Sequence, residues 1–526
     1  MAFFTSRSFV FHVKRAAVAL ALVATATGSG AALTGCGTVS KDFVTGNDRA
    51  LGYTWAQQVQ IGRESDPQIL AQFGAYPNES LEQYVNRIGQ KIVAVSHLRS
   101  GNPATVGLNR PAVPSDVQNT PVTFRVLDSP IINAMALPGG YIYVTRGLLA
   151  NLENEAQLAV VLGHEVGHVA RQHAARQAYQ AQRAQLGLIG AMIAGSVIGG
   201  TAGQVANALG QYGGQGLQLL LLKYGRDAEE ESDRLGVEYA SLAGYDASQA
   251  ADFFISLKRL QQRDGAALPT WMSSHPDPGD REGNIRRMAA EWLTRYPQLP
   301  RAVNEADLDA QTNGIIFGEN PRQGFVQNGV FYHPEMAFQY TIPQGWQVQN
   351  DASMVSFADG RGQSIGQLHL AQGSSAETAA RQFASQQGIQ VLQSGRDNVN
   401  GLPAYVVAAQ AQTQQGVIQT IQYFIEYNGR VYNFAALGTQ QGLAAAQQVY
   451  VNIFKSFRPL TDQRMLARQP NRMNFITATR AGTLASFQPS PLPTGVTLED
   501  VAIANQVQVN AQVQPGARFK IVRSGN

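Results

Sequence analysis

Up to about residue 300 the chain carries mainly helical patterns of apolar and polar positions. Between residues 50 and 98, apolar side chains such as Leu81, Val85 and Ile88 recur at steps of three and four, and this spacing predicts helix. The same periodicity predicts further helices over residues 154–179, 227–243, 253–262 and 283–297. Two runs rich in aromatic and β-branched residues, 122–127 and 141–145, predict strands. We therefore expect a mainly α domain that contains a small sheet.

Beyond residue 328 the pattern changes from helices to short alternating strands. The periodicity fades between residues 300 and 328, so a linker is expected there. Strands are predicted over residues 338–342, 355–357, 365–370, 402–410, 416–427 and 430–437, and helices over 376–386 and 443–455. Asn428-Gly429 lies between two of these strands, which is a strong hairpin signal. The pattern predicts an α+β domain with an antiparallel sheet, and its Ile342-Pro343-Gln344-Gly345-Trp346 resembles the PsbP/Mog-like folds.

The last sixty residues form a separate pattern of strand, helix and strand. A strand at 473–479 leads to Gly482-Thr483-Leu484, a helix is predicted over 498–504, and Pro515-Gly516 precedes a strand at 519–522. This order resembles a small LysM-like α/β module. The module usually has Asp where this chain has Gly482.

The N-terminus has the pattern of a bacterial lipoprotein signal. Basic residues up to Arg15 precede an uncharged apolar stretch, residues 16–32, and Leu33-Thr34-Gly35-Cys36 follows. A charged start, an apolar core and small residues before a cleavage site are typical of a secretory signal. The final tetrapeptide resembles a lipobox, in which Cys36 is lipidated and anchors the protein to a membrane surface. The alternative is a plain signal peptide or a single membrane anchor with an incidental cysteine.

Composition narrows the function classes only slightly. The net charge is +3 and the basic residues are not clustered, so there is no basic stripe of the kind that nucleic acid binding requires. Residues 184–222 contain no charged side chain, and 186–200 are nearly all apolar or small. A membrane-spanning helix needs about 20 apolar residues. We therefore favour a buried or mobile helical segment at 186–200 over one that dips into a membrane.

The sequence His164-Glu165-Val166-Gly167-His168 lies in one of the predicted helices. Residues four apart share a face of a helix, so His164 and His168 can bind one metal ion through two imidazoles. Glu165 lies about 100° around the helix from His164, where its carboxylate can take a proton from a water molecule beside the metal. The alternative is a core helix with two hydrogen-bonded histidines. The uncharged flanks favour the metal site.

A catalytic zinc site needs a third protein ligand and one open position. The candidate segment is Glu229-Glu230-Glu231-Ser232-Asp233, although adjacent carboxylates on a helix are usually a solvated face. Glu229 and Asp233 are four residues apart and share a face, so a ligating Glu229 would place Asp233 where it can accept the far N–H of a histidine ligand. Helix geometry alone leaves Glu230 open as the ligand.

Four segments occur in the order typical of one peptidase family. They are residues 133–148, the His164–His168 motif, residues 226–233 and Ala243-Gly244-Tyr245-Asp246. Together they resemble the HtpX/CAAX-prenyl-protease-like gluzincin metallopeptidases, and among these the BepA/LoiP-type periplasmic lipoproteins. The resemblance implies a zincin-type fold, one Zn²⁺ per chain, Glu229 as the third ligand, and Asp233 as a catalytic proton donor or as the partner of a ligand.

Two further segments extend the resemblance. Ser274-His275-Pro276 with Arg281 six residues after His275 is similar to a BepA-type motif, whose histidine acts as a fourth ligand and switch. The alternative for His275 is a surface loop, and Arg281 either contacts the substrate or transition state or pairs with an acid. Gly139, Gly140 and Tyr141 open a strand that, at a sheet edge, would bind an extended peptide by main-chain hydrogen bonds, or that is an ordinary core strand.

The remaining histidines have no partner at ligand spacing and are expected to be structural or exposed. They are His97, His173, His333 and His369.

These observations predict a multidomain zinc metalloendopeptidase that is anchored to the periplasmic side of the outer membrane and hydrolyses misfolded or misassembled envelope proteins. The expected parts are a signal peptide (1–35), a metallopeptidase domain (36–300), a linker (301–328), an α+β binding domain (329–460) and a LysM-like module (465–526). Two alternatives remain open. One is a chaperone-like assembly factor that cleaves rarely, and the other is a lipoprotein that binds peptidoglycan.

Overall fold

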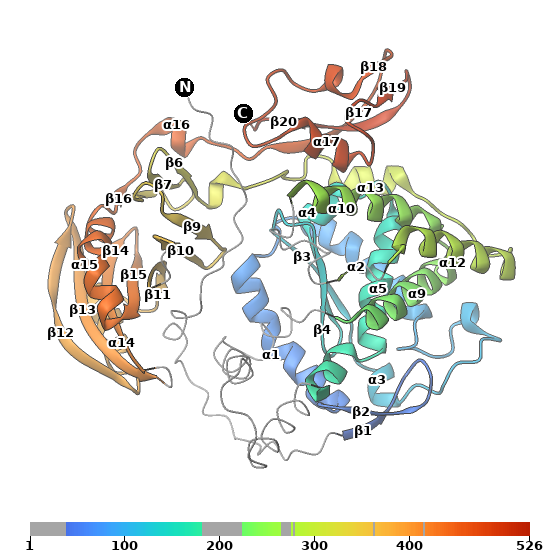
Figure 1. Cartoon of the computed structure of the whole chain (residues 1–526), viewed down its shortest axis with the longest axis horizontal. Helices are drawn as coiled ribbons and strands as arrows, with labels where there is room; N and C mark the ends of the chain where they lie inside the picture. The colour runs from blue at the N-terminus through green and yellow to red at the C-terminus, as the bar shows by residue number, and fades with distance from the viewer. Residues whose placement is uncertain are drawn as a thin grey trace, which may run out of the picture.

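The computed structural model describes residues 38–180, 224–264, 275–276, 279–360, 363–413 and 416–525. The expected signal peptide, Cys36 and the apolar run 186–200 lie outside the described residues. Within these ranges, no helix is both long enough and apolar enough to cross a membrane. The chain is multidomain and α+β, with a mainly helical N-terminal domain, a middle domain built on antiparallel sheet, and a small C-terminal module (Figure 1).

The N-terminal domain is a set of helices around a three-stranded sheet. Its strands are β1 (Thr38–Lys41), β2 (Asp48–Leu51), β3 (Thr123–Leu127), β4 (Ala134–Leu137) and β5 (Tyr141–Thr145). Its helices are α1 (Trp55–Phe73), α2 (Glu79–Val95), η1 (Pro103–Thr105), α3 (Ser115–Gln118), α4 (Arg146–Asn151), α5 (Glu155–Ala170), α9 (Arg226–Leu242), η2 (Ala247–Gln249), α10 (Ala250–Asp264), α12 (Arg281–Arg295) and α13 (Glu305–Thr312). The helix α5 is buried along its whole length, so it forms the centre of this core.

Two of the expected helices are interrupted. The helical pattern of residues 50–98 divides into α1 and α2, because Gly74 has φ of +74° and ends α1, a conformation that glycine adopts without strain. The expected helix 154–179 ends at Ala170 and resumes over 173–180, with Gln172 at φ of +51° between them. Periodicity continues through both breaks, so the apolar pattern alone did not indicate them.

The middle domain contains a seven-stranded antiparallel sheet with one helix on each face. The order of this sheet is β12-β13-β14-β15-β11-β10-β9, and a four-stranded sheet of order β16-β8-β7-β6 lies beside it. Along β14 the side chains alternate between two cores, since Phe424 packs with Phe383 of α14 whereas Tyr423 and Ile425 pack with Phe454 of α15. The antiparallel α+β architecture was correctly predicted.

In the middle domain, the helices and strands have bounds close to the expected ones where apolar and polar residues alternate. The strands are β6 (Phe325–Gln327), β7 (Val330–His333), β8 (Phe338–Thr341), β9 (Gln347–Asn350), β10 (Met354–Ala358), β11 (Ser364–Ala371), β12 (Ile389–Val399), β13 (Leu402–Thr413), β14 (Gly416–Tyr427), β15 (Arg430–Thr439) and β16 (Arg458–Pro459). The helices are η4 (Pro321–Gln323), α14 (Ala376–Ala384) and α15 (Gln440–Lys455).

The C-terminal module consists of two short sheets, two α-helices and a 3-10 helix. Its elements are α16 (Gln463–Leu466), β17 (Arg472–Thr477), β18 (Gly482–Thr483), η5 (Leu484–Phe487), α17 (Leu498–Ala504), β19 (Gln512–Val513) and β20 (Arg518–Arg523), with β17 paired to β20 and β18 to β19. Figure 1 shows this module resting on the N-terminal domain. Met473 of β17 and Ile503 of α17 are buried in the same hydrophobic core as α5.

The segment expected to be a linker is structured. It contains α13, whose Leu308 is fully buried in the N-terminal core, together with buried Ile315 and Ile316. The chain then leaves this core beside the point where it later returns, because Ile316 forms an antiparallel bridge with Arg472 and the amide of Phe317 donates to the carbonyl of Asn471. The middle domain is therefore an insertion between two chain segments, at residues 316–317 and 471–472, that lie side by side.

Candidate metal centre

Glycines bring the two helices that carry the candidate ligands into close contact. The first helix, α5, starts at Asn154, whose side chain accepts a hydrogen bond from the amide of Gln157, a standard N-cap. It crosses α9 where Gly163 faces Gly236, and a Cβ on Gly236 would lie 2.9 Å from the carbonyl oxygen of Val160. A larger residue at this crossing would push the helices apart, so the glycines fix the separation of the motif His164–His168 from Glu229 and Asp233.

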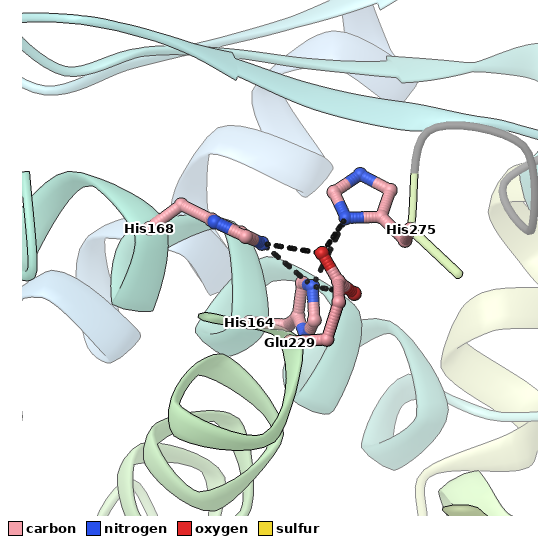
Figure 2. Close-up of side chains that lie close together, drawn as sticks. All are labelled: His164, His168, Glu229 and His275. Atoms are coloured by element: carbon pink, nitrogen blue, oxygen red, sulfur yellow. Dashed lines mark hydrogen bonds and ion pairs between the residues drawn. The ribbon is translucent and has the colours of Figure 1, made fainter. Parts of the chain in front are cut away.

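Four side chains from three segments meet at one point (Figure 2). His164 and His168 come from α5, Glu229 from α9 and His275 from the segment before α12. One ligand atom of each lies within 4.8 Å of all the others, and all four residues are buried. The Nε2 atoms of His164 and His168 are 3.0 Å apart, and each lies 3.5 Å from one oxygen of Glu229. The Nδ1 atom of His275 is 3.3 Å from His164 Nε2 and 3.1 Å from Glu229 Oε1.

The arrangement fits a small tetrahedral cation. Four ligands at about 2.0–2.1 Å from a zinc ion would be separated by about 3.4 Å from one another, and the separations above cluster around that value. Imidazole nitrogens and carboxylate oxygens are also usual ligand atoms for zinc. The residues present therefore fit a metal ion in both their chemistry and their spacing.

The protonation of the two helix histidines suits metal binding. Burial lowers the pKa of both His164 and His168, and for His168 the neighbouring histidines lower it further. Each imidazole is therefore neutral near pH 7 and has a lone pair to give to a metal. Burial alone would raise the pKa of Glu229, but His275 and Arg281 bring it below its ordinary value, so this carboxyl group is ionised.

Asp233 and Arg281 form hydrogen bonds that position the ligand side chains. Asp233 Oδ1 lies 2.8 Å from Nδ1 of His164, the nitrogen that faces away from the cluster. Arg281 donates from Nε and Nη2 to Asp233 at 2.8 and 2.7 Å, and from Nη2 to Glu229 at 3.0 Å. The side chain of Arg281 is 1 % exposed, so of its two expected roles the structure shows the pairing with acids.

Glu165 stands apart from these pairs although it is completely buried. Neither of its carboxylate oxygens has a hydrogen-bond partner among the described residues, and Nε2 of His275 lies 3.6 Å from Oε1. Burial raises the pKa of Glu165 to about 7. A carboxyl group with a pKa near the working pH is well suited to take up and release a proton.

The structure distinguishes between the two glutamates that the sequence left open as the third ligand. Glu229 is fully buried with both oxygens directed to the cluster, whereas the neighbouring Glu230 is exposed. This difference follows from the roughly 100° that each residue turns around a helix.

We expect Glu229→Gln to lower metal binding and Glu230→Gln to leave it unchanged. The first variant removes a charged oxygen from the cluster, and the second changes only a solvated side chain. Metal content after dialysis against buffer with a weak chelator measures the effect. Equal metal content in the two variants would contradict the assignment of Glu229.

The strand that was expected at the edge of the sheet, next to the cluster, lies in the centre of the sheet. The sheet order is β3-β5-β4, so Tyr141 lies in the central strand, and the prediction that Gly139, Gly140 and Tyr141 form an edge is wrong. The two glycines form the β4–β5 turn with φ of +79° and +95°, and a Cβ on Gly139 would lie 2.5 Å from Cα of Val59 in α1. The edge strands are β3 and β4, and β4 borders a cavity of about 10 Å³ that His168 also lines.

Two residues beside the cluster were not identified from the sequence. The ring of Tyr224 stacks on His168 at 4.1 Å between centroids, and no spacing rule connects these positions. His173 was expected to be away from the ligand face, yet its Nδ1 lies 2.9 Å from Nδ1 of His168. The helical pattern continues past Gln172, so no signal in the sequence marked the break that brings His173 to His168.

Comparison with known proteins agrees with this geometry. Residues 107–289 match the model of peptidase family M48. The chain is 30% identical over 244 residues to the putative beta-barrel assembly-enhancing protease of Vibrio cholerae, covering 45% of each chain. It is 32% identical over 172 residues to the mitochondrial metalloendopeptidase OMA1 of Bos taurus, covering 32% of each.

Other similarities are more limited. The metalloprotease YcaL of Escherichia coli is 29% identical over 175 residues, which cover 65% of that protein. A cyanobacterial PsbP structure matches 25% of this chain and 91% of its own, at 13% identity and a TM-score of 0.21, a similarity too weak to establish a fold. The chain spans less than half the length of the first curated relatives that it matches.

Proposed function

We propose that the protein is a zinc-dependent metalloendopeptidase with a zincin-type catalytic domain, since residues 107–289 match the model of peptidase family M48. The observation that carries this proposal is the buried cluster of His164, His168 and Glu229 with Glu165 beside it. Three ligands with one further position, next to a carboxylate that has no hydrogen-bond partner among the described residues, are what metal-assisted hydrolysis of a peptide bond requires.

The side chains divide the work as follows. His164, His168 and Glu229 hold one zinc ion, which when bound lowers the pKa of a water molecule and polarises a carbonyl group. Glu165 accepts a proton during attack on the peptide carbonyl and returns it to the leaving amine. Asp233 orients His164 through its Nδ1–H. Arg281 keeps the carboxylates of Asp233 and Glu229 ionised and in place.

The proposed location and substrates are supported by the N-terminal sequence motif, by the names of relatives and by the strand beside the cluster. The lipobox at Cys36 supports an anchor on the periplasmic side of the outer membrane, and relatives named as beta-barrel assembly-enhancing proteases support envelope proteins as substrates. The edge strand β4 beside His168 supports binding of an extended chain by main-chain hydrogen bonds. Such binding selects unfolded segments with little regard for side chains, as removal of misfolded or misassembled protein needs.

We assign the other two units to binding. The interpretation of the middle domain as PsbP/Mog-like rests on its sequence pattern, and so does the interpretation of the C-terminal module as LysM-like. The order of strand, helix and strand in the module supports a role in holding peptidoglycan near the enzyme. Proteins, the membrane and peptidoglycan are therefore the proposed partners, and nucleic acid is not among them.

One observation favours the alternative of an assembly factor that cleaves rarely. His275 Nδ1 lies among the metal ligand atoms, and its Nε2 faces Glu165. In this position His275 would be the fourth residue to hold the metal, and it would lie between the metal and Glu165. The resting protein would then have a complete metal site that is closed to substrate.

We expect His275→Ala to raise the rate of cleavage of unfolded casein by the purified protein. If His275 blocks the site in nine molecules out of ten, only one molecule in ten is active. Removing His275 would then raise the cleavage rate roughly tenfold, equivalent to about 1.4 kcal/mol. Metal removal by a chelator should abolish the cleavage, and added zinc should restore it. If wild type and His275→Ala both bind zinc and neither cuts casein, the peptidase proposal is wrong. A rate equal to that of wild type would instead reject the closed state.

A further inference from the structure

The two helix histidines are supported in different ways on the side away from the cluster. Nδ1 of His164 meets the carboxylate of Asp233 directly at 2.8 Å. Nδ1 of His168 instead meets another imidazole, because Nδ1 of His173 lies 2.9 Å away. The second nitrogen of His173, Nε2, is 3.1 Å from Oε2 of Glu231. The carboxylate therefore reaches His168 only through His173.

The break in the helix is what creates this contact. In an unbroken helix, five residues turn the chain about 140° beyond a full turn, and His173 would point away from His168. The helix ends at Ala170, Gln172 takes a positive φ, and the chain turns back so that His173 comes over His168. His173 is only 2 % exposed, so the contact lies inside the protein.

The far end of this chain of contacts is also fixed. Glu231 accepts hydrogen bonds from Nε and Nη2 of Arg171, and Nη1 of Arg171 donates to Asp42 at 2.6 Å. Asp42 lies between β1 and β2, where Arg49 pairs with it as well. Glu231 therefore has a set position and is available to accept the N–H of His173.

We propose that His173 and Glu231 are positioning residues of the metal site that select the tautomer and the ring orientation of His168. Only one proton can lie between the two facing Nδ1 atoms. If Glu231 accepts a proton carried on Nε2 of His173, then Nδ1 of His173 is an acceptor and the shared proton belongs to His168. His168 then carries its proton on Nδ1 and presents the lone pair of Nε2 to the cluster.

The opposite arrangement would block the site. A proton on Nδ1 of His173 would be donated to His168, which would then hold its own proton on Nε2, the atom that faces Glu229. Groups that orient the far nitrogen of a histidine ligand typically change metal affinity by about 10–100-fold. This inference rests on the metal site of the proposed function and does not depend on peptide hydrolysis.

The test is zinc affinity of the full chain, measured by competition with a chelating indicator. We expect His173→Phe, which cannot accept a hydrogen bond, to weaken zinc binding by about 10–100-fold. His173→Asn places an amide oxygen near the position of Nδ1 and should recover most of the affinity. Glu231→Gln should weaken binding, because an amide no longer fixes which nitrogen of His173 carries the proton, while Glu230→Gln on the exposed neighbouring position should not.

A second buried histidine separates positioning from general packing. His97 is 5 % exposed and its Nδ1 lies 2.8 Å from the hydroxyl of Tyr239, without reaching the cluster. His97→Phe should lower thermal stability and leave zinc affinity unchanged. Zinc affinity of Glu231→Gln and His173→Phe within about twofold of wild type would overturn the inference; if His173→Phe does not fold, Glu231→Gln alone decides it. Failure of the wild-type chain to bind zinc would instead reject the proposed function.

Discussion

Replacing Glu165 with Gln is expected to lower kcat/KM for unfolded protein by about 10²–10⁴-fold, the usual contribution of a general base. The substitution keeps the size of the side chain and removes its ability to take a proton at a carboxylate oxygen. Because neither oxygen of Glu165 bonds to another described residue, the change breaks no hydrogen bond within that part of the chain. Cleavage of casein should therefore fall while the fold and the zinc content stay as they are.

The measurement needs zinc content and activity from the same preparation. The comparison is best made in the His275→Ala background if the wild type is slow, so that a tenfold loss can be measured. One zinc per chain together with lost cleavage supports Glu165 as the base. Retention of more than a tenth of the activity with zinc bound would show that another group moves the proton.

Replacing Arg281 with Leu is expected to destabilise the metal-free protein by about 3–5 kcal/mol, the usual cost of breaking a buried ion pair by removing one partner. Arg281 is buried against the carboxylates of Glu229 and Asp233. Without it, two buried negative charges would remain with only the histidines nearby. Zinc should recover part of the loss by neutralising Glu229, so the destabilisation should be smaller in the loaded protein.

Chemical denaturation of the metal-free and zinc-loaded forms measures both effects. Arg286 on the same helix is a matched control, since its pair with Asp252 is about half exposed on both sides, and exposed pairs contribute about 0–1 kcal/mol. If Arg281→Leu and Arg286→Leu unfold at the same denaturant concentration, the guanidinium of Arg281 does not support the site.

The sequence indicated the features of the site that lie within one helix. The spacing of His164 and His168 and the four-residue step from Glu229 to Asp233 are properties of helix geometry, and both pairs lie where that geometry puts them. The choice between Glu229 and Glu230 could not be made in this way, because it depends on how α9 is rotated against α5. That rotation is set by the contact of Gly163 with Gly236, which connects residues distant in the sequence.

Features that depend on distant pairing were mostly missed. Tyr141 was placed at an edge because nothing in its own segment shows that β3 and β4 lie on both sides of it. The strand β12 was not predicted, since it is polar and exposed over most of its length and lacks the alternation that a half-buried strand shows. His173 was set aside because its position was calculated for a helix that in fact ends at Ala170.

The insertion of the middle domain has a consequence for the order in which the molecule can be completed. The core around α5 includes Met473 and Ile503, which are translated after the whole middle domain. A nascent chain can therefore form the metal ligands long before it can close the core that surrounds them. Full stability of the catalytic unit should appear only once the last segment has docked, so an incompletely synthesised or truncated chain would be a poor protease.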